Sequence, residues 1–342
     1  MGLLSRTTSL LAVAALATAC AGASAEGGAP GPAKTLTLGY FANVTHAGPL
    51  YGVASGDYQK ALGATELKTQ TFNAGPAAVE ALFAGAVDAA YLGPGPAVNA
   101  FLKSKGAVVL VAGATSGGAS LVVEPGVTDL RGKKIADPQT GGTQDIALRS
   151  YLAAKGLKVD RQGAGDVTIL AEDNSQTLDL FKAGQIDGAW VPEPWASRLV
   201  LEGGGTVLVD ERSLWPQGRF VTTNLLVRED FLRQHPQTVK ALLEGQVEAD
   251  REIKADPARA QQVVNAALKQ LTGTSLKPAV IARAFQQVEV TEDPLAASLK
   301  VAAEHAFATG LVKRGDLRGI YDLTLLRQVL GRDVDDAGLG KG

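Results

Sequence analysis

Short apolar runs alternate with stretches of helical periodicity along most of the chain. From residue 34 onward we expect strands at 36–41, 67–72, 89–92, 108–112, 121–123, 135–136, 167–170, 189–191, 207–209 and 224–227. Helical stretches lie between many of these runs. Alternation of strands and helices is typical of parallel sheets with helices on both faces, so the pattern predicts an α/β fold.

The periodicity becomes almost entirely helical after residue 229. Apolar residues there recur at helical spacing with charged residues between them. Pro236 and Pro257 stand where helices can begin. We expect this region to form a helical cap on one lobe of the protein.

Two segments of the chain repeat each other. LFAGAVDAAYLGP at 82–94 is similar to LFKAGQIDGAWVP at 180–192 when one inserted residue is allowed. Each predicts a helix ending at Gly, a turn with Asp, an apolar strand and a Pro-containing turn into the next helix. The alternative is chance similarity. If the repeat is real, two similar lobes present the carboxyl ends of their strands, where α/β sheets bind ligands.

Composition and charge exclude several classes of protein. The chain is 46% hydrophobic and 20% charged with a net charge of −2, which is ordinary for a globular protein. No basic stretch alternates with aromatic residues, so we expect no nucleic-acid partner. Cys20 is the single cysteine, which excludes an internal disulfide, a CxxC redox pair and a thiolate metal cluster.

The first 33 residues are typical of an exported protein. Residues 10–19 are an apolar run too short to span a bilayer and suited to a signal peptide. We therefore expect a signal peptide at 1–19, lipidation of Cys20 and a flexible linker over 20–33. Cleavage after Ala17-Thr18-Ala19 without lipidation is the alternative, and it also exports the protein.

Five loops follow predicted strands and open helices or turns, and they contain the candidate ligand contacts. Free amide groups at helix starts favour an anionic group, hydroxyl groups donate hydrogen bonds, and glycines let a ligand approach the backbone. The candidates are Asn43, Thr45, His46, Gly93, Pro94, Ser116, Gly117, Gly118, Thr140, Gly142, Thr143, Glu193 and Trp195.

Each of these loops also has a structural interpretation. Asn43 and Thr45 could be ordinary helix caps. The glycines could serve tight turns, and residues 115–118 could cross between lobes. Glu193 could be salt-bridged and Trp195 could belong to the core. The loop 140–144 is the strongest candidate, although it lacks the GKS/T of a nucleotide-phosphate loop.

Three stretches carry a family resemblance. GYFANVTHAGPLYG at 39–52, DAAYLGPGPAVNAF at 88–101 and DGAWVPEPWASRL at 187–199 resemble the binding proteins for aliphatic sulfonates, nitrate and taurine. The resemblance implies a two-lobed type II periplasmic-binding-protein fold, with mixed sheets flanked by helices and two crossing hinge strands. It places lobe one at 34–118 plus 220–342 and lobe two at 119–219. It also implies an ABC permease with a separate ATPase as partner, and adds Asn224 to the ligand contacts.

The candidate loops carry no arginine, so any anion must be held by backbone amides and hydroxyl groups. Such a pocket disfavours a doubly charged ligand. Trp195 and Tyr40 suggest an organic body beside the charged head, which favours an aliphatic sulfonate over nitrate. Nitrate, taurine and a neutral pyrimidine precursor of thiamine remain alternatives.

Catalysis and a structural role are the competing function classes. A related pyrimidine synthase carries a cysteine-rich iron motif that one cysteine cannot provide. His46, His235 and His305 are far apart in sequence, there is no GxSxG elbow, and we expect no metal or other cofactor. A purely structural surface protein would not need two repeated cleft edges. We therefore expect a binding protein rather than an enzyme.

Overall fold

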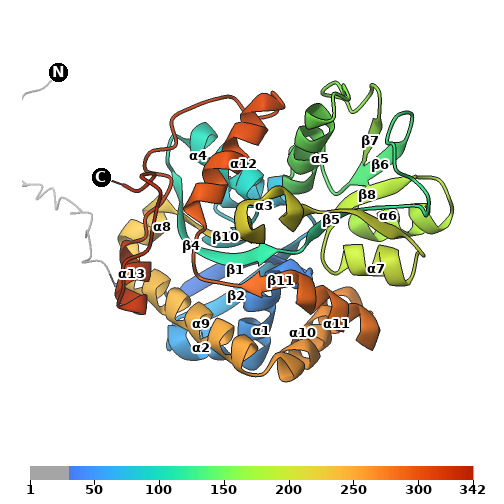
Figure 1. Cartoon of the computed structure of the whole chain (residues 1–342). Helices are drawn as coiled ribbons and strands as arrows, with labels where there is room; N and C mark the ends of the chain where they lie inside the picture. The colour runs from blue at the N-terminus through green and yellow to red at the C-terminus, as the bar shows by residue number, and fades with distance from the viewer. Residues whose placement is uncertain (1–30, 342) are drawn as a thin grey trace, which may run out of the picture.

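The computed structural model describes residues 31–341, which form two sheets flanked by helices (Figure 1). The predicted signal peptide, Cys20 and most of the linker lie outside the described residues. The blue N-terminal and orange to red C-terminal parts lie together, whereas the green to yellow middle of the chain forms a second group. The expected α/β architecture with two mixed sheets is confirmed.

Lobe one is built on a six-stranded sheet and lobe two on a five-stranded sheet. The first sheet has the order β11-β4-β10-β3-β1-β2 and the second the order β7-β6-β8-β5-β9. The strands of lobe one are β1 (Thr35–Phe41), β2 (Glu66–Phe72), β3 (Ala89–Leu92), β4 (Val108–Gly117), β10 (Val221–Arg228) and β11 (Val288–Val290). Those of lobe two are β5 (Ala119–Val123), β6 (Lys134–Asp137), β7 (Thr168–Ala171), β8 (Gly188–Pro192) and β9 (Thr206–Asp210).

Helices cover both faces of each sheet. Those next to the first sheet are α1 (Ala47–Ser55), α2 (Asp57–Leu62), α3 (Gly75–Phe83), α4 (Pro94–Ser104), α8 (Glu229–Gln234), α9 (Pro236–Ala255), α10 (Pro257–Thr272), α11 (Pro278–Gln287), α12 (Ala296–Ala308) and α13 (Thr324–Leu330). Those next to the second sheet are α5 (Thr143–Ala154), α6 (Asn174–Lys182) and α7 (Trp195–Leu201). Short 3₁₀ turns are η1 (Val44–His46), η2 (Glu211–Leu214) and η3 (Pro216–Gly218).

The two repeated segments occupy equivalent places. β3 lies between parallel β1 and antiparallel β10, and β8 lies between parallel β6 and antiparallel β5. The aspartate of each copy also accepts a hydrogen bond from a backbone amide of the neighbouring parallel strand. Asp88 accepts from the Thr37 amide on β1 at 2.9 Å, and Asp187 accepts from the Lys134 amide on β6 at 2.8 Å. The repeat therefore corresponds to one structural unit present in both lobes.

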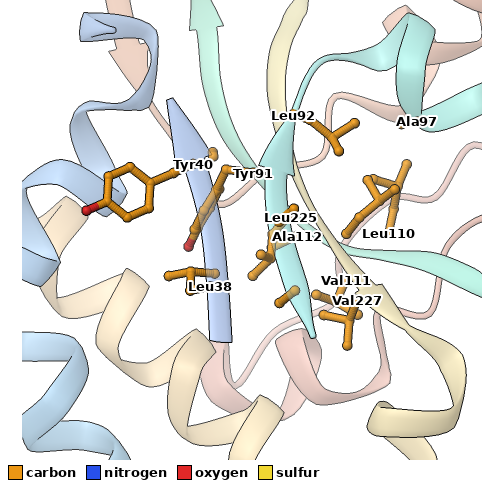
Figure 2. Packing of buried hydrophobic residues seen from close by; sticks show 14 of the residues in the cluster. Leu38, Tyr40, Tyr91, Leu92, Ala97, Leu110, Val111, Ala112, Leu225 and Val227 are labelled. Atoms are coloured by element: carbon orange, nitrogen blue, oxygen red, sulfur yellow. The ribbon is translucent and has the colours of Figure 1, made fainter. Parts of the chain in front are cut away.

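Strand alternation explains how each sheet is covered on two sides. In β5, Leu121 and Val123 join an apolar cluster with Trp190, while Val122 belongs to a different cluster with Ala189. Successive side chains of a strand point to opposite faces, so two clusters on one strand require two covering layers. Figure 2 shows the corresponding packing in lobe one, where β1, β3, β4 and β10 contribute buried apolar side chains.

The chain passes between the lobes twice. β4 leads through Gly118 directly into β5, and the return runs from β9 through η2 and η3 to β10. The predicted lobe limits at 118/119 and 219/220 fall in these two connections. That the lobes move as rigid units with these limits stays a prediction. None of the helices within residues 31–341 has the length and apolar character needed to cross a bilayer.

Candidate functional site: a polar cavity between the lobes

A small cavity of about 30 Å³ is lined by residues of both lobes. Its walls come from loops that follow strands in both lobes. The lining residues are Phe41, Asn43, Thr45, His46, Asn73, Ala74, Gly75, Gly93, Pro138, Gly142, Thr143, Gln144, Asn174, Pro192, Thr222 and Thr223. None of these is Lys, Arg, Asp or Glu, so the described lining carries no acidic or basic side chain other than His46.

Five helices begin at this cavity. They are α1, α3 and α4 of lobe one and α5 and α6 of lobe two, each nine or more residues long. The first amides of a helix have no partner within the helix and carry a partial positive charge. In α5, for example, the internal bonds begin only with the Ile146 amide and the Gly142 carbonyl. The convergence makes the cavity attractive to an anion.

His46 is a neutral donor at this site. Its side chain is buried, and burial lowers its pKa to about 3. Nδ1 accepts from the Phe41 amide at 3.4 Å, so the ring proton belongs on Nε2. The imidazole therefore offers one hydrogen bond and no positive charge near neutral pH. Phe41 packs on the ring with centroids 4.3 Å apart and supplies the aromatic part of the lining.

Hydroxyl groups hold the loop before α1 in place. Thr115 and Thr223 both donate to the Thr45 carbonyl, at 2.7 and 3.0 Å. Thr222 donates to the Gly117 carbonyl at 2.6 Å. These bonds tie β4, β10 and the cavity loop together, so the Thr45 carbonyl is already satisfied from within the protein.

Asn174 has an unsatisfied side chain within the cavity. It is 8% exposed, and its Oδ1 has no hydrogen-bond partner among the described residues. Buried polar atoms almost always have partners, so this atom calls for a solute or water. Because the amide oxygen and nitrogen can exchange places, the group can serve as acceptor or donor.

Charged side chains lie just behind the start of α5. Asp145 is buried; it accepts from the Gly141 amide at 2.7 Å and pairs with Arg149 at 2.5 Å. Burial and the neighbouring Asp145 raise the pKa of Asp137 well above its usual value. The raised pKa of Asp137 favours its uncharged form, and Arg149 balances the charge of Asp145, so these carboxyls do little to oppose an anion in the cavity.

The predicted ligand contacts divide into two groups. Six of them line the cavity: Asn43, Thr45, His46, Gly93, Gly142 and Thr143. Eight do not: Pro94, Ser116, Gly117, Gly118, Thr140, Glu193, Trp195 and Asn224. The cavity therefore takes residues from four of the five predicted loops, with Pro192 as the lining residue of the loop at 192–195, whereas the loop at 115–118 contributes none of the described lining.

Most of the second group has other partners. Ser116 accepts from the Phe220 amide, and Gly117 and Gly118 form the crossing that was the alternative for their loop. Pro94 lines a neighbouring cavity of about 20 Å³, and Thr140 is exposed. Asn224 is fully buried in β10, and both its side-chain polar atoms lack partners in the described structure. Glu193 and Trp195 contact lobe one.

The capping role considered for Asn43 is not observed. Its side chain makes no capping bond to the helix that follows and instead accepts from the Trp195 indole at 2.9 Å. Trp195 is only partly buried and lies outside the cavity lining, as does Tyr40. Neither supplies a wall for an organic body in this arrangement, because the indole is held against lobe one.

Sequence reasoning missed three parts of the lining. Asn73 with Gly75 follows β2, and Asn174 follows β7. Both strands were predicted, so the rule that ligands bind at the carboxyl ends of strands would have found these loops. Thr222 and Thr223 lie on β10, and no local signal distinguishes them from ordinary strand threonines.

Residues 29–268 match the NMT1-like family. The chain belongs to this family.

Individual relatives agree with this placement. A taurine-binding periplasmic protein of Escherichia coli is 32% identical over 209 residues, covering 60% of this chain and 62% of that protein. A putative binding protein of Brucella abortus is 29% identical over 206 residues, covering 59% and 61%. The chain thus matches less than two thirds of the length of these relatives.

Solved structures show the same fold. The alkanesulfonate-binding protein SsuA of Xanthomonas axonopodis, bound to MOPS, aligns with a TM-score of 0.68 at 23% identity, covering 83% of this chain and 96% of that one. The nitrate-binding protein NrtA of Synechocystis aligns with a TM-score of 0.70 at 17% identity, covering 87% and 88%. The predicted two-lobed binding-protein fold of this NMT1-like chain is confirmed.

Proposed function

We propose that the protein is the solute-binding component of an ABC importer and captures a small, singly charged organic anion, an aliphatic sulfonate, between its lobes. The observation that carries this proposal is the convergence of five helix starts on a cavity with no acidic or basic side chain except a neutral His46. Helix amides and hydroxyl groups can hold one negative charge, whereas a dianion needs compensating cations.

The choice of a sulfonate rests on the lining and on relatives. Phe41 lines the cavity and can contact a short organic body, which replaces the role first considered for Trp195 and Tyr40. Relatives named for binding taurine and alkanesulfonates support the same head group. The sulfonate oxygens can accept from several helix starts at once. If the solute is taurine, Asn174 Oδ1, which is unpaired among the described residues, can accept from its ammonium group.

A small planar anion is the second candidate. The cavity measures only about 30 Å³, which favours an ion such as nitrate or bicarbonate over a long alkanesulfonate. Relatives named for binding nitrate and bicarbonate match parts of the chain at 30% identity. A neutral pyrimidine is less well suited because it would leave the positive helix starts uncompensated.

Export, a lipid anchor on Cys20 and docking on a permease with a separate ATPase belong to the same proposal. A binding protein that feeds an importer must stay outside the cytoplasm and close to the membrane. We expect Cys20→Ala to move the protein from the membrane fraction to the soluble extracytoplasmic fraction. Labelling with a radioactive or alkyne-tagged fatty acid should be lost in the same variant.

Catalysis is not part of the proposal, because relatives over most of the chain carry the names of binding proteins. The test is mass spectrometry of the solute carried by natively purified protein, followed by titration calorimetry with ethanesulfonate, taurine, nitrate, bicarbonate and a hydroxymethylpyrimidine. Binding of ethanesulfonate or taurine is expected. Binding of nitrate or bicarbonate alone would select the second candidate, and turnover of any of them would contradict a binding role.

A further inference from the structure

Residues 193–202, which we call the latch segment, follow β8 and contain α7 in lobe two, but they make many of their polar contacts with lobe one. None of them lines the cavity. Helix α7 packs against α11, and Glu202 of the segment faces Lys277, just before α11, at 3.4 Å. The latch segment is therefore placed to act on the relative position of the lobes rather than on a solute directly.

Glu193 is the buried centre of these contacts. Its side chain is 1% exposed, and Oε1 faces the Arg283 guanidinium of α11 at 3.4 Å. The same Arg283 nitrogen donates to the Ser197 hydroxyl at 3.0 Å. Glu193 Oε2 accepts from the Ser197 amide at 3.1 Å, and its backbone carbonyl accepts from the Thr45 amide at 3.4 Å.

Trp195 adds a second bridge beside the first. Its indole nitrogen donates to Asn43 Oδ1 at 2.9 Å, and the Arg198 guanidinium lies over its ring at 4.7 Å. Asn43 and Thr45 both line the cavity. The latch segment is thus bonded to the same loop that faces the solute, from the opposite lobe.

The energetics favour a closed arrangement. A buried carboxylate without a partner is costly, and burial raises the pKa of Glu193, a shift opposed first by the hydrogen bonds from Ser197 and then by the charge of Arg283. Of these two partners only Arg283 belongs to lobe one. Separating the lobes would remove Arg283 from Glu193 and Asn43 from Trp195 together. Interactions that exist only in the closed state slow its opening.

We propose that Glu193, Arg283 and Trp195 form an interlobe latch that sets how long a bound solute is retained, without touching the solute. The residues are positioning residues for the binding site, and the proposal rests on the function proposed above. It assigns Glu193 to Arg283 rather than to an amine of the ligand.

Two solutes distinguish pairing of Glu193 with Arg283 from a direct contact of Glu193 with an amine of the ligand. Taurine carries an ammonium group and ethanesulfonate does not. If the latch is correct, Arg283→Gln and Glu193→Gln each raise the dissociation rate of both solutes by a similar factor, about tenfold or more, with association rates nearly unchanged. The double variant should release solute no faster than the faster of the two single variants, because both substitutions remove the same interaction. A selective loss of taurine binding in Glu193→Gln alone would overturn the latch.

Trp195→Phe is a second variant that keeps the aromatic ring and removes the indole donor. It should also speed dissociation of both solutes. Arg251→Gln is the matched control, because Arg251 pairs with Glu248 on the exposed side of α9 in lobe one. Stopped-flow kinetics that show equal dissociation rates for wild type, Arg283→Gln and Trp195→Phe would contradict the proposal.

A distance measurement tests the latch independently of solute choice. Lys103 and Arg161 are exposed and border one groove from opposite lobes, so spin labels on cysteines at these positions report lobe separation. We expect Arg283→Gln, but not Arg251→Gln, to reduce the short-distance population. If no solute in the panel binds, the proposed function fails. The distance distributions measured without solute then still test whether the latch exists. A short-distance population lost in Arg283→Gln would support it, and identical distributions would overturn it.

Discussion

Single residues decide how closely the two lobes can approach at the cavity. Gly93 precedes α4 in lobe one, and a Cβ there would overlap the Thr143 hydroxyl at the start of α5 in lobe two. Its φ of −79° suits any residue, so the need for glycine comes from the approach of the lobes and not from backbone strain. The close approach at Gly93 places the starts of α4 and α5 near the same anion.

Gly93→Ala should therefore impair closure without impairing folding. We expect solute affinity to fall about tenfold or more, since a steric overlap at the closed interface must be relieved on every binding event. The melting temperature without solute should change little. Calorimetry and thermal unfolding measure the two effects. Unchanged affinity would mean that the lobes need not come this close, and Thr143→Ala in the same chain should recover part of the loss.

His46 makes a prediction about pH. Burial lowers its pKa to about 3, so it is uncharged at pH 5 in the folded protein. A sulfonate is also fully ionised there, and affinity should show no increase as pH falls from 8 to 5. A cationic histidine would instead strengthen anion binding below its usual pKa of about 6.5. Calorimetry at four pH values with His46→Gln as reference distinguishes these outcomes.

At the scale of elements, α9 buries an acid that the proposed function does not use. Asp250 is 1% exposed, and neither of its carboxylate oxygens has a partner among the described residues. Burial, followed by the charge of Glu292, raises its pKa well above the usual value. The folded state therefore holds a proton that the unfolded state releases above pH 4, and stability falls as pH rises through that window.

Asp250→Asn should remove this contribution. Between pH 5 and pH 8 the free energy of unfolding should decline less in the variant than in wild type, as measured by urea denaturation. Part of the decline should remain, because Asp137 has a raised pKa of the same sign. Glu244→Gln on the same helix is the control, since Glu244 is about half exposed at 48% and pairs with Lys240. Parallel slopes for wild type and Asp250→Asn would refute the assignment.

Strands and helices could be predicted where a local sequence pattern marks them. All ten expected strands are present, because each is a short apolar run between turn residues. Helices α9 and α10 begin at Pro236 and Pro257 as expected. β11 was missed because its three residues, Val288–Val290, follow directly on α11 within the helical region and pair only with the end of β4.

The site was predictable only in part, because it depends on which loops face each other. Loops after β1, β3, β6 and β8 were found from glycines, hydroxyl groups and helix starts. The partner of Glu193 could not be predicted, since Arg283 lies 90 residues away and no local pattern connects the two residues. Whether Trp195 walls a ligand or bridges lobes likewise depends on the position of Asn43 in space.

At the scale of the whole molecule, Gly118 is where the first lobe passes into the second. Its φ is +80°, and an added Cβ would lie 2.5 Å from Val288 and 3.0 Å from Thr45, a cavity residue. Alanine there would meet two costs, a left-handed backbone and a collision with both the edge strand and the solute loop. Gly126 has a similar φ of +87° with nothing near its Cβ position, so it carries the backbone cost alone.

Comparing Gly118→Ala with Gly126→Ala isolates the contact at the crossing. We expect Gly126→Ala to lower the unfolding free energy by about 1 kcal/mol and to leave solute affinity unchanged. Gly118→Ala should lower it by more and should also weaken binding, because Thr45 must shift to make room. Urea denaturation and calorimetry on both variants provide the comparison. Equal effects of the two changes would show that the crossing is not mechanically connected to the cavity, and the lobes would then have to close about the return connection alone.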